Sequence, residues 1–279
     1  MADDWRDKPI REASSVILVR PRAGSAAVEV FMLRRHRKSS FMSSAFVFPG
    51  GAAEASDTEP RHTGSRELFE EAGVLLATSQ VNADQLARWR EAINDDDHEA
   101  ELDGVLATAG VSLDLDTLHY FSHWITPSVE RKRFSARFYV AALPPGQTPS
   151  FDNKETVDEV WVTPAEALER SKELKLPPPQ VRTFIDLQAA CEAGIEAVFA
   201  ECARRAEHPH PIMPRLCTSA GDGFCLLLPW DPDYETRGSG DLRPMPADHP
   251  LAVGASRFIL EDMTWKNVGA PAAGSASAD

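Results

Sequence analysis

The sequence has no long apolar run and no excess of positive charge. No apolar stretch among its 279 residues approaches the roughly 18 that a membrane-spanning helix needs. The first twelve residues carry acids and no apolar segment, so we expect neither a membrane span nor a signal peptide. Acidic residues outnumber basic ones by 43 to 29, a net charge of −14. Because phosphate contacts dominate nucleic-acid affinity, we expect no nucleic-acid partner, and an anionic substrate would need metal ions or a local basic cluster.

Cysteine is scarce as well. The chain has four cysteines, and none of them stands in CxxC spacing. Zinc sites and disulfide frameworks usually show such spacing, so we interpret the four as reduced thiols in a cytoplasmic protein. They are Cys191, Cys202, Cys217 and Cys225.

Strands and helices are mixed without strict alternation, which predicts an α+β fold. Short β-branched runs predict strands at 14–20, 28–35, 43–51, 118–127 and 133–143, the first two forming a hairpin and the last two pairing. A helix is expected to open at Pro164, one or two more to follow the proline run at 177–179, and short strands to lie at 224–228 and 256–260. We expect a flexible tail (1–12), a main domain (13–206) with a helical insertion at about 80–116, an extension packed on it (207–266) and a disordered tail (267–279).

The stretch "TGSRELFEEAGV" predicts a helix that starts with Thr63 as its N-cap and ends at Gly73. Glu67, Glu70 and Glu71 stand at i, i+3 and i+4, so they share one face of it. Like charges at this spacing repel, which favours a cation against this face. An acidic face that is merely solvated is the alternative.

Hard divalent cations such as Mg²⁺ prefer carboxylate oxygens. Three carboxylates on one helical turn therefore predict a site for Mg²⁺ or Mn²⁺ that would act on a phosphate oxygen. The glycines just upstream, Gly50 and Gly51, allow backbone to approach a ligand closely.

At this point the sequence resembles the Nudix box, G-x5-E-x7-R-E-U-x-E-E-x-G-U, where U is aliphatic. Residues 66–74, "RELFEEAGV", match the second half at every fixed position, and Gly51 matches the opening glycine. The middle acid departs from the pattern. Asp57 stands at the expected distance from Gly51, with eight residues before Arg66, and Glu59 is the other candidate.

The resemblance extends over about residues 13 to 190, to the Nudix branch that includes the peroxisomal coenzyme A diphosphatases. It rests on "HWITP", "KRFSARFYVAAL", "ETVDEVWVTPAEAL" and "LPPPQVRTFIDL". The chain ends in Ser-Ala-Asp and so shows no peroxisomal address of the Ser-Lys-Leu type. The resemblance implies an α/β/α sandwich with a mixed, curved sheet, and metal-assisted hydrolysis of a pyrophosphate within a small nucleotide substrate.

The same resemblance implies roles for individual residues. Metal ligands would be Gly51, through its carbonyl, and Glu67, Glu70 and Glu71. Catalytic residues would be Glu67, as ligand or base, Glu70, Arg66, which braces the loop, and Glu155, an acid from outside the box with Asp152 and Glu159 as alternatives. Substrate phosphates would meet Arg34 and Arg35 of "RRHRK" and Arg131 and Arg133 of "ERKR", unless these runs are solubilising turns.

Other polar and aromatic residues are interpreted as structural: His36, His119, His123, Trp124 and Trp161. The leading hypothesis is hydrolysis of coenzyme A or acyl-coenzyme A. ADP-ribose or NADH is the alternative substrate, and a non-catalytic nucleotide sensor is the alternative of another class. The sequence does not indicate an oligomeric state.

Overall fold

The computed structural model describes residues 10–37, 43–95, 100–217 and 224–270. Parts of the two expected tails, residues 1–9 and 271–279, lie outside this description. The first strand already begins at Arg11, two residues inside the segment expected to be a tail. None of the described helices combines the length and apolar character needed to cross a membrane.

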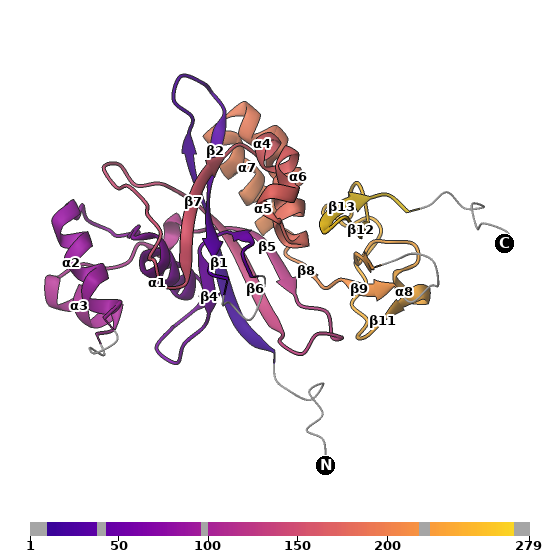
Figure 1. Ribbon diagram of the computed structural model, residues 1–279, viewed down its shortest axis with the longest axis horizontal. Helices are drawn as coiled ribbons and strands as arrows, with labels where there is room; N and C mark the ends of the chain where they lie inside the picture. Colours follow the sequence, from indigo (N-terminus) through magenta and orange to yellow (C-terminus); the bar gives the residue numbers. More distant parts are fainter. Residues whose placement is uncertain (1–9, 38–42, 96–99, 218–223, 271–279) are drawn as a thin grey trace, which may run out of the picture.

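A mixed β-sheet forms the centre of the molecule (Figure 1). Its described strands run in the order β3-β2-β1-β6-β5-β8, with β4 also paired to β1 and β7 to β2. Strands β1 and β6 are parallel, whereas β1 and β2 form the expected antiparallel hairpin and β5 pairs antiparallel with β6. The strands are β1 (Arg11–Pro21), β2 (Val28–Arg35), β3 (Phe46–Val47), β4 (Gly50–Ala52), β5 (His119–Ile125), β6 (Phe134–Ala142), β7 (Thr156–Val162) and β8 (Pro211–Ile212).

Helices cover both faces of this sheet (Figure 1). Helix α1 lies on one face and carries the insertion helices beyond it, and α4 to α7 lie on the other face. This confirms the α/β/α arrangement. The helices are α1 (Pro60–Ala72), α2 (Ala83–Ile93), α3 (Leu102–Ala109), the 3₁₀ turn η2 (Leu115–Thr117), α4 (Pro164–Glu169), α5 (Ser171–Leu174), α6 (Pro178–Ala193) and α7 (Ile195–Ala206).

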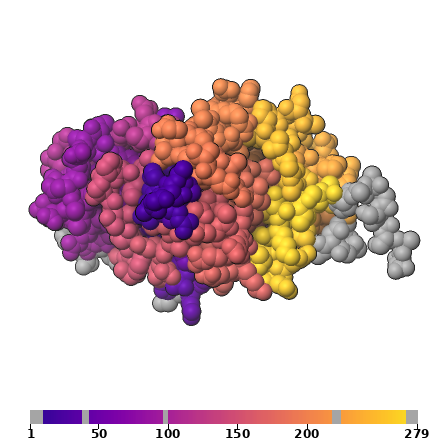
Figure 2. All heavy atoms as spheres, turned by 90° about the horizontal axis from the view of Figure 1, so that it is seen from above, coloured from indigo at the N-terminus to yellow at the C-terminus, as the bar shows by residue number. Residues whose placement is uncertain are grey.

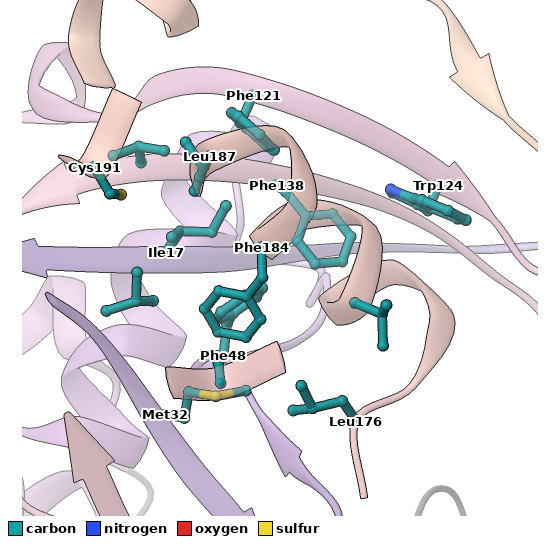
Figure 3. Close-up of a cluster of buried hydrophobic side chains, with 14 of the residues drawn as sticks. Ile17, Met32, Phe48, Phe121, Trp124, Phe138, Leu176, Phe184, Leu187 and Cys191 are labelled. Carbon is teal, nitrogen blue, oxygen red and sulfur yellow. The ribbon is translucent and has the colours of Figure 1, made fainter. Parts of the chain in front are cut away.

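The pleat of β1 divides the core between the two faces, because alternate side chains of a strand point to opposite sides. Val16 and Leu18 are buried toward α1, and Ile17 and Val19 toward α6 and α7. On the α6 side, Phe48 packs edge-on against Phe184, with ring centroids 5.6 Å apart (Figure 3).

A smaller sheet, β11-β9-β10-β12-β13 in its described strands, forms the C-terminal part. Phe258 and Leu251 of this part belong to the same buried cluster as Phe184, so the core is continuous across the junction. Figure 2 shows this part seated against the helices, at the end of the molecule opposite the insertion. Its elements are β9 (Arg215–Cys217), β10 (Cys225–Leu227), α8 (Tyr234–Arg237), β11 (Gly238–Ser239), β12 (Arg257–Glu261) and β13 (Thr264–Val268).

The four cysteines, which all lie in described residues, are buried thiols without a disulfide. Burial raises the pKa values of Cys191 and Cys202 to about 12. Both thiols therefore stay protonated at neutral pH, in line with the expectation of reduced thiols.

Candidate active site

Helix α1 starts four residues earlier than predicted. Pro60 occupies the first turn, where a missing N–H is tolerated, and Glu59 rather than Thr63 is the N-cap residue. Thr63 lies inside the helix, where its hydroxyl forms a hydrogen bond with the Asp57 carboxylate. The expectation that Thr63 is the N-cap was therefore wrong. The helix ends as predicted at Gly73, which has a φ of 69° and donates its N–H to the Phe69 carbonyl.

Leu68 and Ala72 are completely buried and press α1 against the sheet next to β4. A Cβ added to Gly64 would lie 3.3 Å from Val16, so the helix and strand approach closely. This packing brings two of the three box glutamates, Glu67 and Glu71, to Gly51 and Gly50.

Each glutamate of the helix has a different environment. Glu71 is buried, and its Oε2 accepts the N–H of Gly50 at 2.9 Å. Glu67 lies against Gly51, where an added Cβ would come within 2.6 Å of its carboxyl carbon. Glu70 is partly exposed, and its Oε2 lies 2.8 Å from Arg66.

Arg66 is almost fully buried and joins the loop to the helix. Its Nε and Nη2 each donate to the Asp57 carboxylate at 3.1 Å, and Nη2 also donates to the Ala52 carbonyl. Its guanidinium lies 3.2 Å from Glu67 and 2.8 Å from Glu70. Asp57, not Glu59, is therefore the loop partner of Arg66, and the arginine itself is the positive group against two of the glutamates.

Burial dominates the ionisation of these carboxyls. It raises the pKa of Glu67 to about 8 against the opposing pull of Arg66, and the charges of Glu70 and Glu155 add to the rise. Burial, then Glu67, raises the pKa of Glu71 well above its usual range. Burial also raises the pKa of Glu70. A bound cation would relieve this mutual repulsion.

The donor set fits a hard divalent cation. It offers carboxylate oxygens, and the missing Cβ of Gly51 lets the Glu67 carboxylate lie directly against the backbone there. No three His, Cys, Asp or Glu side chains of the described chain are already gathered as metal ligands. To bind the ion, the carboxylate of Glu67 or Glu70 would therefore have to move relative to the guanidinium of Arg66.

Glu155 lies just before β7, and its charge raises the pKa values of both Glu67 and Glu71. The two alternatives are engaged in their own segment. Asp152 accepts the N–H and the hydroxyl of Thr156 at 2.8 and 2.7 Å, and Glu159 accepts the N–H of Phe151 at 2.7 Å. Of these three acids, Glu155 is the one whose charge reaches both Glu67 and Glu71.

The four predicted substrate-binding arginines lie in different places. The charge of Arg35 lowers the pKa of Glu71, which places it beside the box. Arg34 pairs with Asp158 at 3.3 Å, and Arg131 is exposed in the β5–β6 turn. Arg133 donates to the Thr126 carbonyl and to Asp241, and so joins the β5–β6 turn to the C-terminal part.

Most residues interpreted as structural are so placed. Trp124 is buried in the core, and Trp161 packs on Phe31 and under the guanidinium of Arg20, 3.9 Å from its ring centroid. His123 shares a 2.8 Å hydrogen bond with Ser135. Sequence reasoning missed Arg90 of α2, which contacts the end of α1; nothing in the spacing of α2 distinguishes this arginine.

The chain is similar to known proteins. Residues 60–187 match a family model described as the NUDT19 Nudix domain. The chain is 28% identical to the acyl-coenzyme A diphosphatase NUDT19 of Gallus gallus, with 80% of this chain and 81% of that protein covered. It is 27% identical to the protein of the same name from Xenopus laevis, with 74% and 71% covered.

Among solved structures, a Nudix hydrolase from Alicyclobacillus acidocaldarius superposes with a TM-score of 0.58 at 24% identity, covering 70% of this chain and 97% of that one. This likeness shows the fold. The box and the family match mark residues 60–187 as a Nudix hydrolase domain, and with it the protein is an enzyme that acts on pyrophosphate bonds. Within that class it resembles the acyl-coenzyme A diphosphatase branch.

Proposed function

We propose that this enzyme is a metal-dependent diphosphatase of coenzyme A or acyl-coenzyme A. One observation carries the metal dependence: Glu67 and Glu71 meet Gly51 and Gly50, Glu70 stands on the same helix turn, and the setting raises the pKa values of all three. The substrate class is supported by the names of the two relatives, both called acyl-coenzyme A diphosphatases.

In this proposal Glu67, Glu70 and Glu71 and the Gly51 carbonyl hold Mg²⁺ or Mn²⁺. The bound ions supply Lewis acidity to the phosphate oxygens and lower the pKa of water. Water attacks one phosphorus of the diphosphate, and the bond from that phosphorus to the bridging oxygen breaks. From coenzyme A the products are 3′,5′-ADP, which keeps one of the two diphosphate phosphorus atoms, and 4′-phosphopantetheine, which keeps the other.

The protein groups have separate tasks in this reaction. Glu67 or Glu155 accepts the proton of the attacking water, because both lie in the same acidic cluster. Arg66, tied to Asp57, keeps Glu67 and Glu70 in place. Arg35, beside Glu71, meets a substrate phosphate.

The test is a substrate panel with Mg²⁺ or Mn²⁺: coenzyme A, an acyl-coenzyme A, ADP-ribose, NADH and a diadenosine polyphosphate, with products identified by mass. We expect 3′,5′-ADP from coenzyme A, no product after chelation with EDTA, and recovery when metal is returned. Glu71→Gln should abolish turnover. Glu169→Gln, an exposed change on α4, should leave it unchanged.

Each other outcome has a definite meaning. Faster cleavage of ADP-ribose or NADH would retain the metal site and reject the coenzyme A assignment. No turnover of any substrate with metal present, together with tight nucleotide binding, would reject catalysis and favour a sensor.

A further inference from the structure

Arg90 of the insertion reaches the last turn of the box helix. Its Nε donates to the carbonyl of Glu70 at 3.1 Å, and its Nη2 donates to the carbonyl of Glu71 at 2.6 Å. Asn94, one turn further along the insertion, donates to the Glu70 carbonyl at 3.2 Å. The insertion therefore binds the backbone of two residues whose side chains are proposed metal ligands.

The contact of Arg90 with α1 satisfies carbonyl groups that are unpaired at the end of any α-helix. The last four carbonyls of an α-helix have no partner within the helix, and the partial negative charge at that end favours a cation. A planar guanidinium can serve two of these carbonyls at once. Gly73 makes room for it, because a Cβ there would lie 2.9 Å from Nη1 of Arg90.

The same guanidinium holds a third segment of the chain. Its Nη1 donates to the hydroxyl of Ser150, and its Nη2 to the Ser150 carbonyl, both at 2.9 Å. Ser150 precedes the turn that carries Glu155, and the ammonium of Lys154 in that turn donates to the Asn94 carbonyl. Arg90 thus links the end of the box helix to the segment that bears the outer acid.

The insertion also holds the beginning of the helix. His62, in the first turns of α1, shares a 3.0 Å hydrogen bond with Asp103 of α3. Between the two ends, Phe69 of α1 packs with Leu86 and Leu106 of the insertion in one buried cluster. Helix α1 is therefore fixed at both ends and along one side by a segment that contributes no proposed metal ligand.

We infer that Arg90 is a positioning residue: its guanidinium sets the end of the box helix against the Ser150–Glu155 segment, so that the proposed metal ligands Glu70 and Glu71 and the proposed proton acceptor Glu155 are held in one arrangement. This inference rests on the proposed function, since it assigns the insertion a role in that site. It predicts an effect on metal binding that is separate from any effect on folding.

The experiment compares Arg90→Ala and Arg90→Lys with Arg88→Ala. Arg88 is exposed on the same helix and donates to the Asp84 carbonyl within it, which makes it a matched control. Mn²⁺ binding to the substrate-free protein is followed by electron paramagnetic resonance, on samples shown to be folded by circular dichroism. Steady-state kcat and KM are measured alongside at saturating Mn²⁺.

Partners that orient metal ligands typically change affinity or activity 10- to 100-fold when removed. We expect Arg90→Ala to weaken Mn²⁺ binding about tenfold or more and to lower kcat, with KM for the nucleotide nearly unchanged. Arg90→Lys should recover part of the affinity, since one ammonium cannot span all four acceptor atoms. Arg88→Ala should bind Mn²⁺ as the parent protein does.

Folded Arg90→Ala protein with parental Mn²⁺ affinity would overturn the inference, whatever its melting temperature. If Arg90→Ala does not fold, Arg90→Lys decides. Parental Mn²⁺ affinity in Arg90→Lys would contradict the role of the planar guanidinium, and weakened Mn²⁺ affinity would support it. Failure of the proposed function looks different, because the parent protein would then bind no Mn²⁺ or Glu71→Gln would bind it equally well.

Discussion

The guanidinium of Arg66 and the carboxylate of Asp57 meet through two parallel hydrogen bonds of 3.1 Å each. Both side chains are almost completely buried, at 6% and 2% exposure. Although burial opposes it, the bond from Arg66 keeps the pKa of Asp57 below its usual value. The pair closes the lengthened loop between Gly51 and the helix.

Removing Asp57 should therefore destabilise the protein. Asp57→Ala leaves Arg66 buried without its two parallel hydrogen bonds, with Glu67, Glu70 and the more distant Glu54 as anionic partners. We expect a loss of about 1–3 kcal/mol in unfolding free energy. Urea unfolding followed by circular dichroism measures it. Glu59→Ala is the matched control, because Glu59 is exposed and its side chain makes no capping bond; a larger loss in that variant would mean that the wrong acid had been assigned.

Gly51→Ala should impair metal binding and turnover without unfolding the protein. The new Cβ would overlap the Glu67 carboxylate, which must move, so we expect Mn²⁺ binding and turnover to fall at least tenfold while the protein stays folded. Gly104→Ala makes the same change inside α3, where nothing lies within 4 Å. That control should keep full activity and gain about 0.4–1 kcal/mol of stability. Parental Mn²⁺ affinity in Gly51→Ala would argue against Glu67 as a ligand.

His123 should make stability depend on pH. Burial, and then Arg137, lowers its pKa to about 4, so the folded protein holds His123 neutral while the unfolded chain takes up a proton near pH 6.5. The unfolding free energy should therefore decrease as the pH falls from about 6.5 to about 4, by about 1–2 kcal/mol after allowance for solvent screening. Glu12, Arg243 and Ser135 are the other groups that face this ring.

The contribution of His123 is isolated by difference. Unfolding free energies of the parent and of His123→Gln are compared at pH 7, 5.5 and 4.5. The gap between the two proteins should shift in favour of the variant as the pH falls, and a constant gap would show that His123 does not titrate in this range.

Arg182 should hold the C-terminal part on the main domain. It donates to the carbonyls of Val253 and Ala255, pairs with Asp186 at 2.8 Å, and stacks over Trp230. We propose that residues 207–266 fold with the main domain, and we expect Arg182→Ala to lower stability by about 2–4 kcal/mol and to speed proteolysis within 240–256.

Limited proteolysis provides the readout for this proposal. Arg170→Ala serves as control, since Arg170 forms only an exposed pair with Glu173 and its loss should change stability by under about 1 kcal/mol. A stable, separate C-terminal fragment from the parent protein would contradict folding as one unit.

Local patterns predicted much of this structure. The strand at 28–35 has the predicted bounds, and Thr163 and Glu166 form a capping box around the predicted helix start at Pro164. Such features depend on neighbours within a few residues. Thr63 shows the limit of such local predictions. The helix begins earlier, with Pro60 in its first turn, and the Thr63 hydroxyl forms a hydrogen bond with Asp57 instead of capping the helix.

The sequence by itself determined the class of the protein. Glu67, Glu70 and Glu71 share a face wherever residues 66–73 form a helix, because the 3.6-residue period decides this without reference to the rest of the chain. The glycine at 51 and the helix stop at 73 are read from the same local spacing.

Only the tertiary structure decided which remote groups meet that helix. It brought Asp57 rather than Glu59 to Arg66, placed Arg90 at the end of the helix, and used Arg133 at the C-terminal junction. These contacts join residues 9, 20 and 108 positions apart. Spacing along the chain does not fix such contacts, because they depend on how a loop, an insertion and a second sheet pack against the core.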